Sequence, residues 1–257
     1  MIHKTFDDTT PAIISPDYGH KGVQHADTCI ITYSCEVRDN ALQQFPARQA
    51  GALNCINGDV PVYVLTYKGR DIAFYMSPIT APVAAMCLEE ASQLVGARHI
   101  IMFGSCGVLD SQIAQGKLIV PTEAYRDEGV SYHYRSADTS YLPIPTSART
   151  AQIFEEMGLP HVSGRTWTTD GFYRETRGNM EKRRAEGCIS VEMECAALQA
   201  VCDFRGYQYY PFLISSDLLD SPQWDRRILG NDDERTHQLK TFYVALELAV
   251  RVGEDTK

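Results

Sequence analysis

The sequence predicts an α/β fold in which helices pack on a mixed β-sheet. Between Pro11 and Leu109, short apolar and β-branched segments alternate with longer segments of helical periodicity. Lys68 and Gly69 separate two apolar segments and predict a tight antiparallel hairpin, so the sheet is expected to be mixed. Seven strands are expected, at 12–14, 29–33, 60–67, 71–76, 99–103, 117–120 and 209–215.

Three helices are expected, because apolar residues recur at intervals of three and four positions. Their ranges are 82–95, 190–204 and 241–252. Gly96 and Gly206 follow the first two ranges and predict their C-terminal ends, since glycine adopts the left-handed conformation that ends many helices.

The composition excludes several classes of protein. The chain has 257 residues, a formal net charge of −9 and 44% hydrophobic residues, which is long enough to bury a core without disulfides. The acidic balance, without a run of Lys or Arg, argues against a nucleic-acid partner. No apolar run could cross a bilayer and the N-terminus lacks a signal-peptide core, so we expect a cytoplasmic protein with no membrane partner.

Cysteine spacing and chain organisation point the same way. The eight cysteines are scattered without a Cys-x-x-Cys pair, which predicts reduced thiols and no metal site. No internal repeat, low-complexity segment or Pro/Gly-rich linker divides the chain. Residues 1–257 are therefore expected to form a single domain.

The first of three motifs follows the strand expected at 99–103. The strand leads directly into Gly104-Ser105-Cys106-Gly107, which predicts a tight turn. Such a turn would expose backbone N–H groups at the carboxyl edge of the sheet, where α/β folds bind ligands and where anions find hydrogen-bond donors.

The second motif contains two acids two residues apart, Glu192 and Glu194, before an Ala-rich apolar helix. They cannot share one helical face. One acid can accept hydrogen bonds from the unpaired N–H groups of the helix start, while the other projects into a cleft. A carboxylate in a cleft can accept two hydrogen bonds from a vicinal diol such as that of ribose.

The third motif is Ser215-Ser216-Asp217, an acid at the end of an apolar strand that begins at Tyr209. A partly desolvated carboxyl at that position can hold a proton and act as a general acid. An N-terminal helix cap is the alternative interpretation.

Together, and in this order, the three motifs resemble nucleoside phosphorylases of the purine nucleoside and uridine phosphorylase type, a family that includes the methylthioadenosine/adenosylhomocysteine nucleosidases. The similarity extends through residues 127–134 and 169–173. The resemblance implies a three-layer α/β/α fold around a mixed, partly closed sheet. It also implies self-association as dimers or hexamers and cleavage of an N-glycosidic bond. Neither a metal nor an organic cofactor is implied, only inorganic phosphate as a possible co-substrate.

The resemblance also assigns roles to individual residues. Glu194 would bind the ribose 2′- and 3′-hydroxyls, with Met193 packing on the sugar. Phe172 would stack on the base or sugar, and Asp217 would lie by purine N7 as the general acid. The other residues assigned to the substrate site are Ser105, Gly104, Cys106, Gly107, Glu192 and Ser216.

The base is expected to be a purine. The Ser216-Asp217 pair is typical of the purine-specific members. Uridine phosphorylases carry a Gln-x-Arg clamp shortly after the Phe-Tyr pair, whereas here Phe172-Tyr173 is followed by Arg174-Glu175-Thr176-Arg177, without that Gln. A uridine phosphorylase remains the alternative.

The chain departs from the family in its phosphate site. Family members hold phosphate with one arginine in a Gly-Asp-Pro-x-Arg motif after the first strand, one just before the Gly-Ser/Thr turn, and one from a neighbouring subunit. No such motif follows the strand expected at 12–14, Met102 takes the place of the turn arginine, and the neighbour's arginine aligns near Asn57. Without guanidinium partners a dianion loses binding energy.

Three functions therefore stay open. A phosphorylase could rebuild the anion site from Ser105, His20, Lys21 and Arg126, with His25, Arg38 and Arg48 as further candidates. A nucleosidase would use water instead of phosphate, with Asp17 or Glu192 as the base. An inactive nucleoside-binding sensor domain is the third, which the retained Glu194 and Asp217 argue against.

Overall fold

The computed structural model describes residues 2–16, 25–56 and 58–254. Its strands are β1 Thr28–Thr32, β2 Ala47–Leu53, β3 Val60–Tyr67, β4 Arg70–Met76, β5 His99–Val108, β6 Leu118–Asp127, β7 Tyr141–Pro143, β8 His161–Thr169, β9 Cys188–Glu192 and β10 Gln208–Leu218. Its α-helices are α1 Cys35–Gln44, α2 Ala81–Val95, α3 Ser111–Ala114, α4 Ser131–Tyr134, α5 Ser147–Glu156, α6 Arg177–Ala185, α7 Cys195–Arg205 and α8 Asp232–Val252. Two short 3-10 helices are η1 Ile2–Lys4 and η2 Phe172–Arg174.

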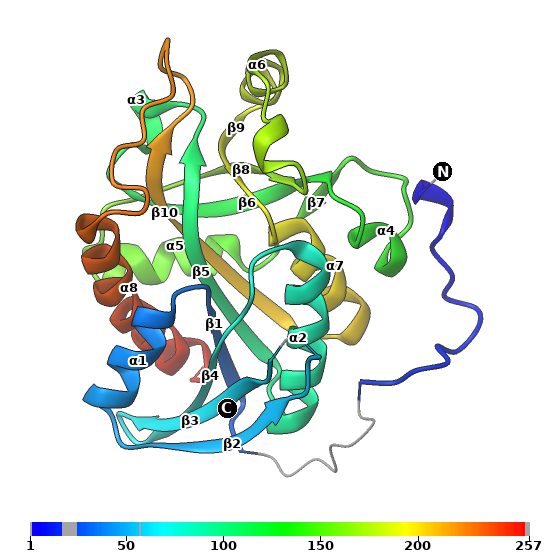
Figure 1. Ribbon diagram of the computed structural model, residues 1–257, viewed down its shortest axis with the longest axis vertical. Coiled ribbons are helices and arrows are strands. Elements are labelled where there is room, and N and C mark those ends of the chain that lie inside the picture. The colour runs from blue at the N-terminus through cyan, green and yellow to red at the C-terminus, as the bar shows by residue number, and fades with distance from the viewer. Residues whose placement is uncertain (1, 17–24, 57, 255–257) are drawn as a thin grey trace.

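All ten strands belong to one mixed sheet (Figure 1). The strand order is β10-β6-β8-β9-β5-β1-β4-β3-β2, with β7 paired to β6. Because β10 also pairs with β5, the strands β10, β6, β8, β9 and β5 close into a ring, and the others extend from it as an open sheet. The predicted mixed and partly closed sheet is confirmed.

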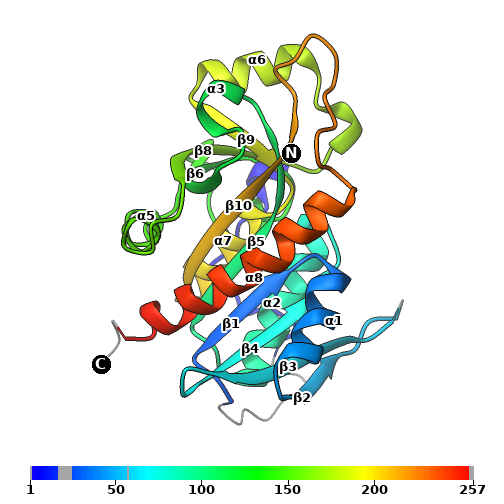
Figure 2. The ribbon, with the colours of Figure 1, turned by 90° about the vertical axis from the view of Figure 1, so that its left-hand side faces the viewer.

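Helices cover both faces of this sheet, as the three-layer prediction requires. One core cluster joins the sheet to α2 and α7, and a second joins the opposite face to α1, α5 and α8. Figure 2 shows α1 and α8 together on the face turned toward the viewer, with α2 and α7 behind the strands. No helix in the described part of the chain is both long and apolar enough to span a bilayer.

The predicted hairpin is confirmed between β3 and β4, where Tyr67 pairs with Arg70. Its two loop residues, Lys68 and Gly69, both have positive φ, at 48° and 77°. Positive φ at both positions is what a two-residue hairpin loop needs to match the twist of its strands.

Several predicted boundaries were wrong. Residues 12–14 form no strand, and Ile13 and Ile14 are 103% and 79% exposed. A short β-branched run is a strand only if it finds a partner to pair with, and here the first strand is β1.

The helix expected from residue 190 begins only at Cys195 because β9 precedes it, and α8 begins at Asp232 rather than 241. The added start of α8 is polar, so it carries no apolar periodicity to detect.

Candidate active site

The site is built around a gap in the pairing of β5. The predicted turn at 104–107 is wrong, because these residues continue β5 and pair with β10 along their whole length. On the other edge, β1 pairs as far as Met102 and β9 pairs only from Gly107. Neither pairing covers residues 103–106, so the sheet opens there between strands that leave in different directions. Such switch points are where α/β sheets bind ligands.

Two glycines allow side chains to approach this opening closely. A Cβ on Gly104 would lie 3.0 Å from Cδ2 of Tyr33. A Cβ on Gly107 would lie 2.6 Å from Cδ1 of Leu219 and 2.9 Å from Cγ1 of Val191. Both distances at Gly107 are shorter than real Cβ contacts, so any larger residue here would require the side chains of Leu219 and Val191 to shift.

Glu192 ends β9 and caps α7. One carboxylate oxygen, Oε2, accepts the backbone N–H groups of Glu194 and Cys195, each at 2.6 Å, and Oε1 accepts the Thr168 hydroxyl at 2.5 Å. The side chain is buried, and burial raises its pKa. The prediction that one acid of the pair caps the helix is confirmed. Oε2 of Glu192 is thus engaged by the backbone and Oε1 by the Thr168 hydroxyl, and the assignment of Glu192 to substrate or to activation of water stays a prediction.

Glu194 is the other acid and lies against the start of α2. Its Oε1 accepts the backbone N–H of Thr80 at 2.8 Å. Burial, followed by the negative charge of Glu192, raises the pKa of Glu194 to about 8. Thr80 holds φ at 99°, an outlier for a β-branched residue, so backbone strain accompanies this contact.

Tyr33 joins Glu194 at the same opening. The Tyr33 hydroxyl is buried and has no hydrogen-bond partner among the described residues. Burial raises its pKa, and among the neighbouring charges Glu194 has the largest effect. A buried hydroxyl without a partner is costly, so a ligand that hydrogen-bonds it beside Glu194 would remove that cost.

Asp217 reaches the site through a β-bulge. Ser215 pairs with Cys106 and Asp217 with the next residue, Gly107, so Ser216 is the extra residue of β10. Bulges redirect side chains next to active sites. Because Gly107 also pairs with Val191 of β9, Asp217 lies two strands from the segment that leads into Glu192 and Glu194.

A cavity of about 240 Å³ contains two of the predicted site residues, Asp217 and Phe172. The residues that line it come mainly from α6 and the segments before it and after β10, which lie together at one end of the molecule (Figure 2). The residues around it are Phe172, Tyr173, Glu175, Arg177, Met180, Asp217, Leu219 and Trp224. Aromatic faces with a few polar groups are typical of sites for planar ligands.

Two groups in this cavity act directly on Asp217. The indole Nε1–H of Trp224 donates to Oδ2 of Asp217 at 2.7 Å. Burial, together with the charge of Asp217, raises the pKa of Glu175 to about 8. The cavity therefore holds two interacting carboxyls, and at neutral pH one of them is largely protonated.

Ser105 and Cys106 point to opposite faces of β5. Ser105 Oγ accepts the side-chain amide of Gln238 in α8 at 3.0 Å. Cys106 is buried in the α2 and α7 core, where its Sγ contacts the Ile214 carbonyl and burial raises its pKa. Cys106 is not among the residues that line the cavity of Asp217, and its position in the base pocket stays a prediction.

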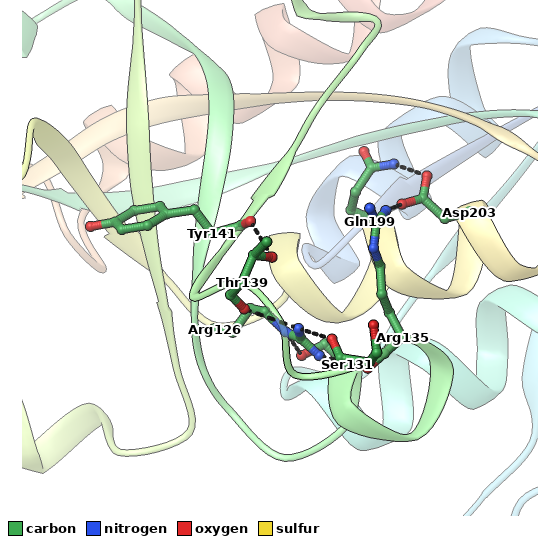
Figure 3. Close-up of polar contacts among 8 residues, drawn as sticks. Arg126, Ser131, Arg135, Thr139, Tyr141, Gln199 and Asp203 are labelled. Atoms are coloured by element: carbon green, nitrogen blue, oxygen red, sulfur yellow. Dashed lines mark hydrogen bonds and ion pairs between the residues drawn. The ribbon is translucent and has the colours of Figure 1, made fainter. Parts of the chain in front are cut away.

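Arg126 is not available to phosphate. Figure 3 shows its guanidinium enclosed by the segment that follows β6. Nε donates to the Ser131 hydroxyl at 2.9 Å, Nη1 to the carbonyls of Ser136 and Thr139, and Nη2 to the Arg135 carbonyl. Because Arg126 is only 3% exposed, these bonds offset its desolvation, and the residue shapes the loop instead of binding an anion.

The other residues predicted for the anion site or for water activation lie in different parts of the chain. Asp17, His20 and Lys21 lie outside the described residues. Met102 is buried in the core. Arg38, by contrast, lies in α1 shortly after the true first strand, which is where the family carries its first phosphate arginine.

The Arg38 side chain is partly exposed. Its Nε pairs with Asp39 Oδ1 at 2.7 Å, and its Nη1 lies 3.9 Å from Met76 Sδ. Met76 ends β4 and pairs with Thr32 at the end of β1, so this guanidinium lies near the carboxyl ends of both strands. No group of three or more His, Cys, Asp or Glu within the described ranges could hold a metal ion.

Five residues of this site escaped the sequence analysis: Tyr33, Thr80, Glu175, Trp224 and Gln238. Tyr33 and Thr80 each follow a strand, which is a detectable signal once the strand order is known. Glu175 and Trp224 lie in segments without periodicity and meet only through the fold.

Comparison with known proteins identifies relatives over most of the chain. The family model described as the phosphorylase superfamily matches residues 27–250. The guanosine phosphorylase of Halorubrum lacusprofundi is 27% identical over 157 residues, which cover 58% of this chain and 62% of that protein. The DeoD-type purine nucleoside phosphorylase of Alkaliphilus metalliredigens is 24% identical over 207 residues, covering 79% and 85%.

A solved structure shares the fold. The crystal structure of purine nucleoside phosphorylase from Toxoplasma gondii in complex with immucillin-H superposes with a TM-score of 0.71. The match covers 91% of this chain and 93% of that chain at 18% sequence identity.

Proposed function

The chain belongs to the phosphorylase superfamily, and on that premise we propose that it cleaves purine nucleosides with phosphate as the acceptor. The observation that carries the proposal is the single cavity that contains both Asp217 and Phe172. An acid and an aromatic ring in one small cavity suit a purine base as a leaving group.

The chemistry assigns a task to each acid. As the glycosidic bond breaks, the purine gains negative charge and the sugar becomes an oxocarbenium-like cation. Asp217 carries negative charge beside Glu175 in the free protein. A purine whose N7 faces Asp217 favours the protonated acid, so Asp217 takes up a proton with the substrate and donates it toward N7 as the bond breaks. Burial raises the pKa of Glu194 to about 8, so the acid is largely protonated without substrate. Ribose hydroxyls that donate to Glu194 favour its ionised form, which then places negative charge near the cationic sugar.

Phosphate is the acceptor that the relatives favour, since those named above are purine nucleoside or guanosine phosphorylases. Within this chain, Ser105 on β5 and Arg38 on α1 are the groups that we propose for the anion. A guanidinium suits phosphate, and β5 offers unpaired strand edge beside Ser105. The base pocket carries acids in place of a Gln, which favours a purine over uridine.

Hydrolysis is the second candidate. Met102 stands where the turn arginine is expected, and Arg126 is fully engaged with its own loop. Without the turn arginine, and with Arg126 bound to its own loop, water would replace phosphate and the product would be free ribose.

Two further properties form part of the proposal. The reaction needs charge placement but neither a metal nor an organic cofactor. Self-association is supported by exposed apolar side chains, among them Ile13, Ile14, Ile56, Met86 and Phe204.

The test is release of free base from inosine, adenosine, guanosine, uridine and methylthioadenosine, each with and without phosphate. Phosphate-dependent release from purine nucleosides with ribose 1-phosphate as product is expected. Release of free ribose without phosphate would establish the nucleosidase. Binding of nucleosides without release from any of them would establish an inactive sensor domain.

A further inference from the structure

Glu175 is a second acid in the cavity of Asp217, and the proposed function gives it no task. It lies between η2 and α6, whereas Asp217 lies near the end of β10. It lines the cavity together with Asp217, and its side chain is partly buried. A carboxyl placed against another carboxyl is unfavourable unless a proton or a ligand compensates.

The surroundings of Glu175 keep it neutral. Burial and the negative charge of Asp217 raise its pKa to about 8. The nearby cation, Arg177, donates instead to the carbonyls of Ser221 and Pro222, at 2.8 and 3.3 Å. At neutral pH Glu175 therefore offers one O–H donor beside one carbonyl acceptor.

We propose that Glu175 is a specificity-determining residue that binds the edge of the purine six-membered ring while Asp217 faces N7. N7, the substituent on C6, and N1 lie along one edge of a purine, so two neighbouring acids can meet them together. A neutral carboxyl donates to O6 and accepts N1–H of hypoxanthine or guanine. It equally donates to N1 and accepts the 6-amino group of adenine. The inference rests on the proposed function and predicts that 6-oxo- and 6-aminopurines are both substrates.

The test compares Glu175→Gln and Glu175→Ala on inosine, adenosine and purine riboside, which has no substituent on C6. Gln keeps one donor and one acceptor, so we expect kcat/KM within about threefold of the original protein. Ala removes two hydrogen bonds, so we expect a loss of about 10- to 100-fold for inosine and adenosine, mainly in KM. Purine riboside, which can form only one of these bonds, should lose less. Glu181→Ala, an exposed acid of α6 outside the cavity, is the matched control.

The outcomes separate the two proposals. An equal loss for all three substrates, no loss, or equal damage by Gln and Ala would overturn the role of Glu175 while the proposed function stands. If the original protein cleaves no nucleoside, the proposed function fails. Calorimetric binding of hypoxanthine, adenine and unsubstituted purine to the same variants then tests Glu175 directly, with the same ranking expected.

Discussion

Two pairs of acids meet in this molecule, and their surroundings differ. In the pair of Glu192 and Glu194, one carboxylate is bonded to two backbone N–H groups and the other to one. In the pair of Glu175 and Asp217, which lines a cavity, the indole of Trp224 donates to Asp217. Glu192 is part of the framework, whereas the second pair faces a space that a ligand can fill.

The difference shows how one fold positions acids in two ways. Backbone N–H groups are fixed by β9 and α7, so they hold the Glu192 carboxyl in a set position whether or not substrate is bound, although burial raises the pKa of both acids of this pair. A cavity supplies no fixed donors to Glu175, so burial and the neighbouring charge favour its protonated form. Proton donation belongs to the second pair, and charge placement belongs to the first.

The most severe test removes the proton from the second pair. Asp217→Asn retains an acceptor for Trp224 but cannot protonate a leaving base. We expect kcat to fall by about 10²–10⁴-fold with little change in nucleoside affinity. Steady-state kinetics and calorimetry measure the two quantities, and Asp225→Asn, an exposed acid of the same segment, is the control. Equal turnover in the variant and the original protein would mean that Asp217 is not the acid.

The corresponding change in the first pair should affect stability. Glu192→Ala leaves two backbone N–H groups and the Thr168 hydroxyl without their buried acceptor. We expect the free energy of unfolding to fall by about 3–5 kcal/mol. Urea denaturation measures it, with Glu181→Ala as a matched exposed control. A loss similar to that of the control would show that the cap contributes little.

The dependence of stability on pH tests the raised pKa of Glu194. The pKa of Glu194 is raised to about 8 in the folded protein, above its unfolded value, so folding favours the protonated carboxyl. Its contribution is fully present below the unfolded pKa and is lost as the pH rises through 8. Urea denaturation from pH 5 to 9 should therefore show a steeper decline in the original protein than in Glu194→Gln. Parallel curves would contradict the raised pKa.

The sequence predicted the mixed sheet and the helix-capping acid because those features are local, whereas the turn predicted at 104–107 is a continuation of β5. Apolar strands, the Lys68-Gly69 hairpin and the spacing of Glu192 and Glu194 depend on nearby residues. The arm at 12–14 was misassigned because its β-branched residues satisfy strand propensity without a pairing partner. That error placed the first strand too early, so the residues after it were 15–21 instead of the start of α1, which contains Arg38.

The remaining site residues could not be predicted for a related reason. Glu175 and Trp224 are 49 positions apart in the numbering and share a cavity only because α6 and the segment after β10 lie together. The strain at Thr80 is a property of its backbone angle, which no residue pattern encodes. Contacts between distant segments follow from topology, which a single sequence specifies only indirectly.

The smallest effect concerns the contact that positions Glu194. Thr80 adopts a φ of 99°, where a β-branched residue is strained by about 1–3 kcal/mol. Thr80→Gly relieves that strain and keeps the backbone N–H that Glu194 accepts, while the flexibility of glycine in the unfolded chain costs about 0.5–1 kcal/mol. We expect a net gain of about 1 kcal/mol in the free energy of unfolding. The control is Ile79→Gly at the adjacent position, which is not among the residues with positive φ and should lose stability. If both variants lose stability equally, glycine does not relieve the strain at Thr80, and the hydrogen bond from Thr80 to Glu194 does not depend on a strained backbone angle.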